Sequence, residues 1–113
     1  MQAQDLLKLI TSTLEDSKAL DIVEIDLVGE SSLSDYIVLC SATSSAHAKG
    51  IHDKVHLAVK EKGIYPLGVE GETDGGWILM DYNDVILHIF EEDLREVYHI
   101  EEMHKRAQSR RVQ

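Results

Sequence analysis

The segment His52-Asp53-Lys54-Val55-His56 places two histidines four residues apart with a carboxylate between them. On a helix this spacing imitates the H-E-x-x-H motif, in which the histidines bind zinc and the glutamate is a general base. The aspartate shortens that base by one methylene, and no third ligand is obvious, although His47 lies about one turn earlier. The two histidines also flank an apolar helical stripe that contains Ile51 and Val55, and an exposed flank is sufficient to explain them. We therefore predict no metal site and no cofactor.

Two other features carry reactive or ligand-binding groups. Cys40 lies in an apolar run, where a cysteine is expected to be a buried and inert thiol. The segment 70–76 is rich in glycine and acid, so it should repel a phosphate group rather than bind one. No catalytic residue is predicted from either feature.

The composition indicates one compact domain over residues 1–113. The chain has a mass of 12.7 kDa, with 43% apolar residues, 28% charged residues and a single proline, values that argue against disorder. No apolar run reaches the ~20 residues that cross a membrane, and Met1–Asp5 does not resemble a secretory signal. The single cysteine cannot form an internal disulfide, so we expect a cytoplasmic setting.

The charge is strongly negative and unevenly distributed. The formal net charge is −10, yet residues 103–113 contain four of the 11 Lys and Arg and none of the 21 Asp and Glu. A chain with this much negative charge should be repelled by free nucleic acid and could instead dock on a basic protein. The same charge could also serve only solubility.

The hydrophobic pattern predicts three helices and five strands. The helices span Gln4–Ser17, Ala46–Lys62 and a last segment from Glu91–Asp93 to beyond Met103; the strands span Ile22–Val28, Tyr36–Ala42, Tyr65–Val69, Trp77–Tyr82 and Val85–Phe90. The order α-β-β-α-β-β-β-α indicates an α/β (α+β) fold, a mixed five-stranded sheet with flanking helices. The helix between the second and third strands implies a right-handed crossover and a parallel pair. We expect the basic tail from about residue 105 to fray, above all beyond Gln108.

Local signals support several of these elements. The strand Tyr36–Ala42 is a continuous apolar run, which is typical of a central strand covered on both faces. In the strand Ile22–Val28 apolar and acidic residues alternate, which predicts one buried and one wet face. Thr43–Ser45 supplies N-cap candidates for the second helix, and Gly63 is well placed to end it.

The last two strands form a predicted hairpin around Asn83-Asp84, because asparagine tolerates the left-handed backbone of tight turns. In this register Trp77 pairs with Phe90, and Leu79 pairs with His88. Side chains alternate across a strand, so one face is almost wholly apolar and resembles core; it carries Ile78, Met80, Tyr82, Val85, Leu87 and Ile89. The other face mixes aromatic, charged and imidazole groups; it carries Trp77, Leu79, Asp81, Ile86, His88 and Phe90. This mix is typical of protein interfaces, although a core face under a helix with a wet edge would also produce it.

Long blocks of the chain resemble a known family. They are PLGVEGE at 66–72, WILMDYNDVILHIF at 77–90, and the shorter stretches 31–38, 41–45 and 95–101. These blocks resemble the Iojap family, whose members are also called ribosomal silencing factors. The resemblance extends from about Leu6 to Glu102.

This resemblance implies a function that composition alone does not indicate. Family members bind the large ribosomal subunit through a basic ribosomal protein, large-subunit protein fourteen, and block joining of the small subunit when nutrients are short. They also affect large-subunit assembly, and free members often form homodimers. The implied fold has a nucleotidyltransferase-like core without the active site. The expected protein is a translation repressor rather than an enzyme, with no membrane partner and no sequence-specific nucleic acid binding.

The residues of the implied docking surface come from two sources. The match to the family blocks carries over Glu70, Trp77, Asp81, Tyr82, Asp84 and His88. Leu79 and Phe90 are added from the predicted hairpin register. The acidic body would complement a basic partner and raise the rate of encounter.

The chain departs from the family pattern at two places. Asn83 stands where the family usually has glycine, and asparagine is the next most tolerant residue for positive φ. Met103-His104 stands where the last helix often has Leu-Trp, so any contribution of that tryptophan to docking or dimerisation is missing here.

Alternative functions stay open. A large-subunit assembly factor could use the same docking surface. A nucleotidyltransferase would need paired carboxylates to hold Mg²⁺; Asp35 precedes a strand and Asp26 lies on its expected neighbour, but no Gly-Ser phosphate turn leads into them. The tail Lys105–Arg111 could contact ribosomal RNA, although a solvated helix end is the interpretation that we favour from sequence.

Overall fold

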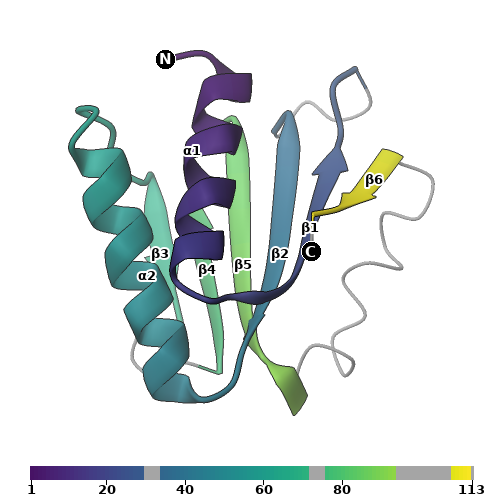
Figure 1. Cartoon of the computed structure of the whole chain (residues 1–113). Coiled ribbons are helices and arrows are strands. Elements are labelled where there is room, and N and C mark those ends of the chain that lie inside the picture. Colours follow the sequence, from purple (N-terminus) through teal and green to yellow (C-terminus); the bar gives the residue numbers. More distant parts are fainter. Residues whose placement is uncertain (30–33, 72–75, 94–107, 113) are drawn as a thin grey trace.

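The computed structural model describes residues 1–29, 34–71, 76–93 and 108–112. Within these ranges the chain forms two helices and six strands (Figure 1). In chain order they are α1 (Ala3–Asp16), β1 (Leu20–Asp26), β2 (Tyr36–Ala42), α2 (Ser45–Lys60), β3 (Gly68–Glu70), β4 (Trp77–Asp81), β5 (Val85–Glu91) and β6 (Gln108–Arg111). Neither of the helices in the described ranges is long and apolar enough to span a membrane.

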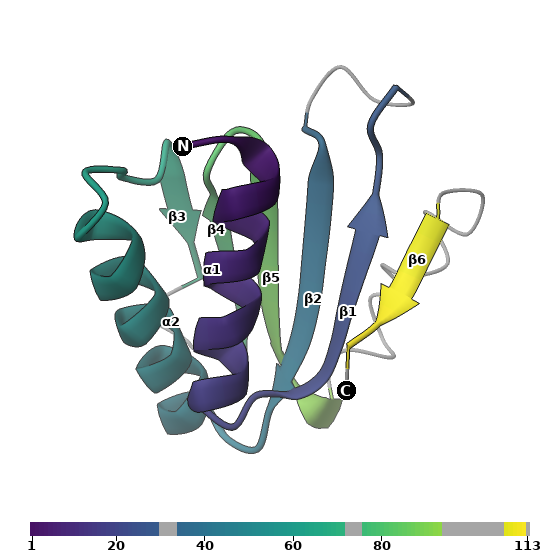
Figure 2. The same ribbon diagram turned by 45° about the horizontal axis from the view of Figure 1, so that its top comes forward.

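The strands form one mixed sheet in the order β3-β4-β5-β2-β1-β6. β2 and β5 are parallel, and the other neighbouring strands are antiparallel. Both described helices lie on the same face of this sheet, as two views of the ribbon show (Figure 1 and Figure 2). The sheet therefore has a helix-covered face and an opposite face.

Short-range interactions set the ends of α2. The Oγ of Ser44, its N-cap residue, accepts a 3.1 Å hydrogen bond from the backbone N–H of His47. After the helix, the N–H of Gly63 donates to the carbonyl of Lys60 at 2.8 Å, and Gly63 has a φ of +79°. Ser44 is one of the three N-cap candidates in the sequence, and Gly63 is the predicted end of the helix.

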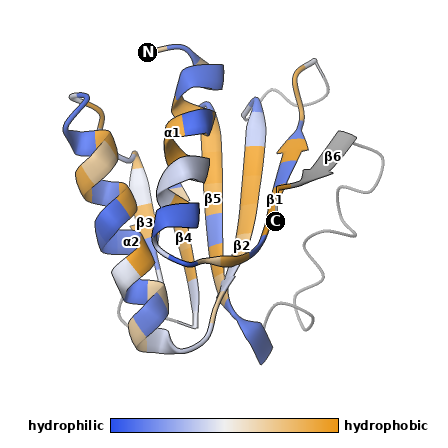
Figure 3. Cartoon of the chain, in the orientation of Figure 1, coloured by the Kyte–Doolittle hydropathy of each residue, from blue (hydrophilic) through white to orange (hydrophobic). Residues whose placement is uncertain are grey.

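Buried apolar side chains form two clusters. The larger cluster lies between the helices and the sheet, and it includes Ile10, Leu14, Val38, Ile51, Val55 and Leu87. The smaller cluster takes the alternate positions of the strands, on the opposite face; it consists of Val23, Ile25, Leu27, Ile37, Leu39 and Phe90. Every residue of β2 is buried, as predicted for a central strand, and β2 and β5 are mainly hydrophobic (Figure 3).

The predicted mixed sheet with flanking helices is confirmed, but one connection differs from the expectation. β3 runs parallel to β2, yet β4 and β5 lie between them, so the adjacent parallel pair is β2–β5. The physical reason is burial. β5 is largely buried and lies beside the fully buried β2, whereas the short β3 has two exposed residues and lies at the edge.

The C-terminal end also departs from the prediction of a frayed tail. Residues 108–111 form β6, antiparallel to β1, and the N–H of Val112 donates to the carbonyl of Ile22 at 2.8 Å. β1 presents backbone groups on its free edge that the tail pairs with, and Glu24 lies opposite Arg110 in this register. The predicted last helix lies outside the described residues beyond position 93.

Candidate partner-binding site

The β4–β5 hairpin has the register predicted from the sequence. The paired residues include Trp77 with Phe90, Leu79 with His88, and Asp81 with Ile86. The N–H of Tyr82 donates to the carbonyl of Val85 at 2.9 Å, and Asn83 in the turn has a φ of +70°. Positive φ is less costly for asparagine than for most residues, so Asn83 can serve where glycine would.

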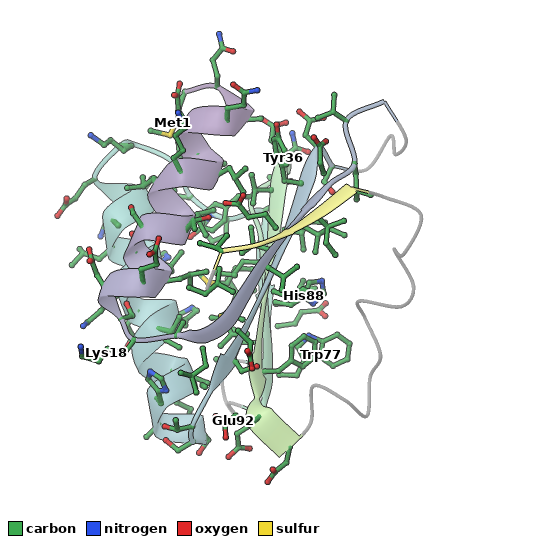
Figure 4. The ribbon with its side chains drawn as sticks, turned by 45° about the vertical axis from the view of Figure 1, so that its right-hand side comes forward. Met1, Lys18, Tyr36, Trp77, His88 and Glu92 are labelled. Atoms are coloured by element: carbon green, nitrogen blue, oxygen red, sulfur yellow. The ribbon has the colours of Figure 1, made fainter. Side chains whose placement is uncertain are left out.

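The sheet face opposite the helices collects most of the predicted docking residues. We call it the aromatic face and define it by Glu70, Trp77, Leu79, Asp81, Ile86, His88 and Phe90 of β3, β4 and β5. Glu70 joins this set because it pairs with Leu79 across the β3–β4 ladder. The side chains of Trp77 and His88 point away from the two helices (Figure 4). All predicted docking residues except Tyr82 and Asp84 therefore share one face.

Trp77, His88 and Phe90 form a contiguous aromatic cluster. The indole of Trp77 stacks on Phe90, with ring centroids 5.2 Å apart and an interplanar angle of 24°. The rings of His88 and Phe90 are nearly parallel, with an interplanar angle of 7° and ring centroids 5.8 Å apart. The Nε1–H of Trp77 donates a 3.0 Å hydrogen bond to Nδ1 of His88. A nitrogen that accepts this bond carries no proton, so the geometry assigns the neutral imidazole with its proton on Nε2.

Burial varies across the aromatic face. Phe90 is fully buried and His88 is 8% exposed, whereas Trp77, Leu79, Asp81 and Ile86 are half-buried and Glu70 is exposed. Phe90 belongs to the smaller cluster, against which Trp77 packs. Phe90 therefore supports the indole from the core side, and the groups that a partner can reach lie toward β3 and β4.

Gly71 holds the end of β3 close to Trp77. It has a φ of +79°, and a Cβ at this position would collide with the backbone carbonyl oxygen of Trp77. Glycine is the residue that satisfies both the left-handed backbone and the close approach. Sequence reasoning treated the segment 70–76 as a loop that does not bind phosphate and as part of a family block, and it missed this contact. A glycine directly after a strand is the signal that could have indicated it.

Two carboxylates lie near the hairpin turn and differ in role. Oδ1 of Asp81 accepts a 2.8 Å hydrogen bond from the N–H of Asn83, so this side chain stabilises the turn and adds negative charge to the aromatic face. Asp84 is half-buried in the turn. Its backbone carbonyl accepts hydrogen bonds from the N–H groups of Asp35 and Tyr36, at 2.9 and 3.0 Å. These contacts of Asp84 join the turn to the start of β2.

Tyr82 lies on the helix-covered face. Its side chain is 5% exposed and belongs to the larger cluster. Within the part of the chain that the structure describes, its buried hydroxyl has no hydrogen-bond partner. Burial raises the pKa of Tyr82 to about 12, because the phenolate would lose solvation. The structure thus gives the Tyr82 side chain a role in packing rather than a place on the aromatic face.

The histidines of α2 do not assemble a metal site with the described residues. His52 and His56 stack with ring centroids 6.0 Å apart. His47, the candidate third ligand, is engaged elsewhere: its Nε2 lies 3.0 Å from the carbonyl oxygen of Ser17. No group of three potential ligands exists among the residues described. His47 instead links the start of α2 to the end of α1.

The other residues considered for catalysis also have structural contacts. Cys40 is fully buried in β2, as predicted. Oδ1 of Asp26 accepts a 2.9 Å hydrogen bond from the N–H of Val28, and the carbonyl of Asp35 accepts one of 2.8 Å from Leu27. These bonds stabilise the chain where it leaves β1 and enters β2.

Comparison with known proteins identifies the family of this chain. The family model described as "Ribosomal silencing factor during starvation" matches residues 1–113. The chain belongs to the ribosomal silencing factor family. A ribosomal silencing factor of Zymomonas mobilis is 38% identical over 98 residues, which cover 87% of this chain and 74% of that protein. A ribosomal silencing factor of Haemophilus influenzae is 34% identical over 98 residues, which cover 87% of this chain and 96% of that protein. Both relatives are named for a regulatory role rather than a catalytic one.

Solved structures share the silencing factor fold described above. A crystal structure of a Chromobacterium violaceum protein has a TM-score of 0.89 and 32% identity, over 93% of this chain and 88% of that one. A crystal structure of a Bacillus halodurans protein has a TM-score of 0.81 and 30% identity, over 88% of this chain and 93% of that one. A mouse relative, "Mitochondrial assembly of ribosomal large subunit protein 1", is 28% identical over 84% of this chain and 43% of its own length.

Proposed function

We propose that this silencing factor binds the large ribosomal subunit and represses translation by keeping the small subunit from joining it. Its contact on the subunit is a basic ribosomal protein at the joining surface, large-subunit protein fourteen. The mechanism is steric, because a protein bound at that surface occupies the space that the small subunit needs. It requires no catalytic residue, metal or cofactor, and it operates in the cytoplasm.

The aromatic face is the observation that carries this proposal. A half-buried tryptophan that is stacked on a buried phenylalanine and hydrogen-bonded to a histidine is already ordered before a partner arrives. Large, ordered aromatic side chains contribute most to binding at protein interfaces, because little conformational entropy is lost when they are covered. Trp77 is therefore the residue expected to contribute most to the affinity.

The charge of the aromatic face supports a basic partner. Glu70 and Asp81 lie on the same face as Trp77, Glu70 opposite Leu79 and Asp81 at the far end of β4, and Glu70 is exposed. The whole chain carries a net charge of −10. A negative surface of this kind speeds encounter with a basic protein and disfavours wrong, acidic partners.

The proposal is tested by sedimentation of the purified protein with separated ribosomal subunits at moderate salt. We expect co-migration with the large subunit only, and fewer joined ribosomes when the small subunit is added. Trp77 is the only tryptophan in the chain, so its emission should also shift to shorter wavelength when isolated large-subunit protein fourteen is added. Migration with neither subunit would overturn the proposal.

A charge reversal on the aromatic face gives a matched test. Asp81→Lys places a positive charge on the same face as Trp77, at the other end of β4, and should abolish co-migration with the large subunit. Asp53→Lys makes the same change on the exposed side of α2, where the aspartate side chain is 77% exposed, and should leave binding intact. A folded Asp81→Lys variant that binds as strongly as the wild type would show that the docking surface lies elsewhere.

A second candidate function is assembly of the large subunit. It is supported by the mouse relative, whose name describes assembly of the mitochondrial large subunit. Cells that lack this protein would then accumulate large-subunit precursors, which gradient centrifugation separates from mature subunits. Repression of joining alone predicts normal precursor levels and an excess of joined ribosomes during starvation.

The homodimer that the family resemblance implies stays a prediction. Light scattering of the free protein at several concentrations would measure it. If the dimer covers the aromatic face, Asp81→Lys should also shift the free protein toward the monomer.

A further inference from the structure

β3 forms one edge of the sheet (Figure 1). It pairs with β4 on one side, and it is the last strand in the sheet order of the described residues. Gly68 and Glu70 are exposed, and Val69 between them is half-buried. An edge strand presents backbone N–H and C=O groups with which a further extended chain can pair. β3 can therefore accept an added strand.

Two acids lie along the aromatic-face side of this edge. Val69 packs against the larger cluster on the helix-covered face, so Gly68 and Glu70 take positions on the aromatic face. Gly68 lies opposite Asp81 of β4. Asp81 and Glu70 are therefore two positions apart along the strand direction, one on β4 behind the glycine and the other on β3 itself.

Gly68 leaves Asp81 accessible from the edge. A Cβ at residue 68 would have no heavy atom within 4 Å, and glycine has no side chain to cover the acid opposite it. Oδ1 of Asp81 accepts the N–H of Asn83, and a carboxylate has a second oxygen that can accept from another donor. A strand added to β3 would lie two strand spacings from β4, about 10 Å. A long basic side chain on that strand, opposite Gly68, can extend across the glycine toward Asp81.

The charge of the edge disfavours a second copy of this chain as the added strand. If two β3 strands paired antiparallel about Val69, Glu70 of each copy would lie opposite Gly68 of the other, and hence near the second copy's Asp81. Like charges in neighbouring positions of a sheet are destabilising. An extended segment with basic side chains meets opposite charges at the same positions. The occupant that fits this edge is therefore a basic strand.

We propose that β3 binds an extended segment with the side-chain order basic, apolar, basic, which pairs with its outer edge as an added strand. One basic side chain lies opposite Gly68 and reaches Asp81, and the other lies opposite Glu70. The apolar side chain between them lies beside Val69 on the helix-covered face. This inference rests on the proposed function for the source of the segment, which is the basic protein that docks on the aromatic face. Backbone pairing supplies affinity, and the two acids select the sequence.

Labelled peptides test the strand addition directly. The full chain should bind the peptide Thr-Lys-Val-Lys-Thr, measured by fluorescence anisotropy, and should not bind the same peptide with glutamate in place of both lysines. N-methylation of the valine blocks one edge of the peptide backbone, and N-methylation of both lysines blocks the other edge. Because an added strand pairs with β3 through one edge only, one methylated peptide should lose at least about tenfold in affinity, and the other should bind nearly as before.

Gly68→Leu tests the space in front of Asp81 without a change in charge. The new side chain covers the acid from the edge, so affinity for the unmodified peptide should fall about tenfold. The Tm should stay near that of the wild type, because residue 68 has room for a Cβ and a φ outside the left-handed region. Glu70→Lys should weaken peptide binding at least as much. Asp53→Lys, the matched charge reversal on α2, should leave the affinity within about twofold of the wild type, because salt screens a distant charge.

Failure of the wild type to bind the peptide at about 1 mM would overturn the inference. Equal effects of the two methylated peptides, or equal losses in Glu70→Lys and Asp53→Lys, would do the same, because binding would then depend on charge alone. All of these results would leave the proposed function standing.

Competition tests the source of the segment. The unlabelled peptide should release the protein from large subunits, and a peptide that binds without doing so would overturn the assignment of the segment to the docking partner. Absence of large-subunit binding by the wild type would overturn the proposed function itself, whether or not the peptide binds.

Discussion

The Nε1–H of Trp77 donates a 3.0 Å hydrogen bond to Nδ1 of His88, although the two residues are diagonal rather than paired across the β4–β5 ladder. The residue paired with Trp77 is Phe90, and the indole stacks on that ring. One neighbour therefore fixes the plane of the indole, and the other fixes its rotation. An indole held in this way loses little conformational freedom when a partner covers it.

Trp77→Phe separates the hydrogen bond from the stacking. The phenyl ring can still pack on Phe90, but His88 loses its donor. We expect the free energy of unfolding to fall by about 1 kcal/mol and the affinity for the large subunit to fall about tenfold. Urea unfolding and co-sedimentation measure the two effects, with Trp77→Ala as the variant expected to abolish binding. Wild-type affinity for Trp77→Phe would mean that the hydrogen bond does not position the docking residue.

Gly71→Ala should damage the site through the backbone. The new Cβ meets the carbonyl oxygen of Trp77, and an alanine at φ +79° is strained in addition. We expect a loss of about 2–4 kcal/mol in unfolding free energy and weaker partner binding.

Gly68→Ala is the matched control for Gly71→Ala. It lies on the same short strand, and its Cβ would have no heavy atom within 4 Å. Its unfolding free energy should change by less than about 1 kcal/mol. Equal stability of the two variants would show that the close approach at Gly71 is relieved without cost.

Tyr82→Phe should stabilise the protein, because it removes a buried hydroxyl that has no partner among the described residues. The expected gain at neutral pH is about 1 kcal/mol, with no change in partner binding since the side chain is buried. Urea unfolding of both proteins measures it. Tyr65→Phe, at a tyrosine that is 60% exposed, should have no effect on stability.

The raised pKa of Tyr82, about 12, also predicts an alkaline effect. Below the pKa of an unfolded tyrosine, about 10, both states hold the phenolic proton and this group makes stability independent of pH. Between pH 10 and 12 the unfolded chain loses the proton while the folded chain keeps it, so stability falls by up to roughly 2–3 kcal/mol. In Tyr82→Phe the loss of unfolding free energy between pH 10 and 12 should be smaller by these roughly 2–3 kcal/mol, because the variant has no phenol to titrate at this position. Identical alkaline profiles for wild type and Tyr82→Phe would contradict the raised pKa.

Asp53→Ala and the double change His52→Gln with His56→Gln should leave large-subunit binding unchanged. These residues lie on α2, on the face of the sheet away from Trp77. Metal analysis of the purified wild type should find no stoichiometric zinc. Loss of binding in Asp53→Ala, or one bound zinc per chain, would restore the metal interpretation of this segment.

Hairpin register was predictable because it depends on neighbours in the sequence. Alternating residues, a turn residue that tolerates positive φ, and a two-residue loop decide which side chains share a face. Local signals likewise put the N-cap of α2 within Thr43–Ser45, where the structure selects Ser44, and placed Cys40 in the core. Tyr82 shows the limit of the resemblance: the family blocks carried it over as a docking residue, while the strand alternation assigned it to the apolar face, where the structure places it.

The sequence by itself determined the types of most elements, the two faces of the hairpin and the family. These follow from local periodicity and from long matching blocks. Only the tertiary structure decided that β5 rather than β3 lies beside β2, that the tail pairs with β1, and that Gly71 touches the carbonyl of Trp77. Each of these contacts joins residues whose approach depends on how whole strands compete for burial and for free backbone edges, and local patterns do not contain that information.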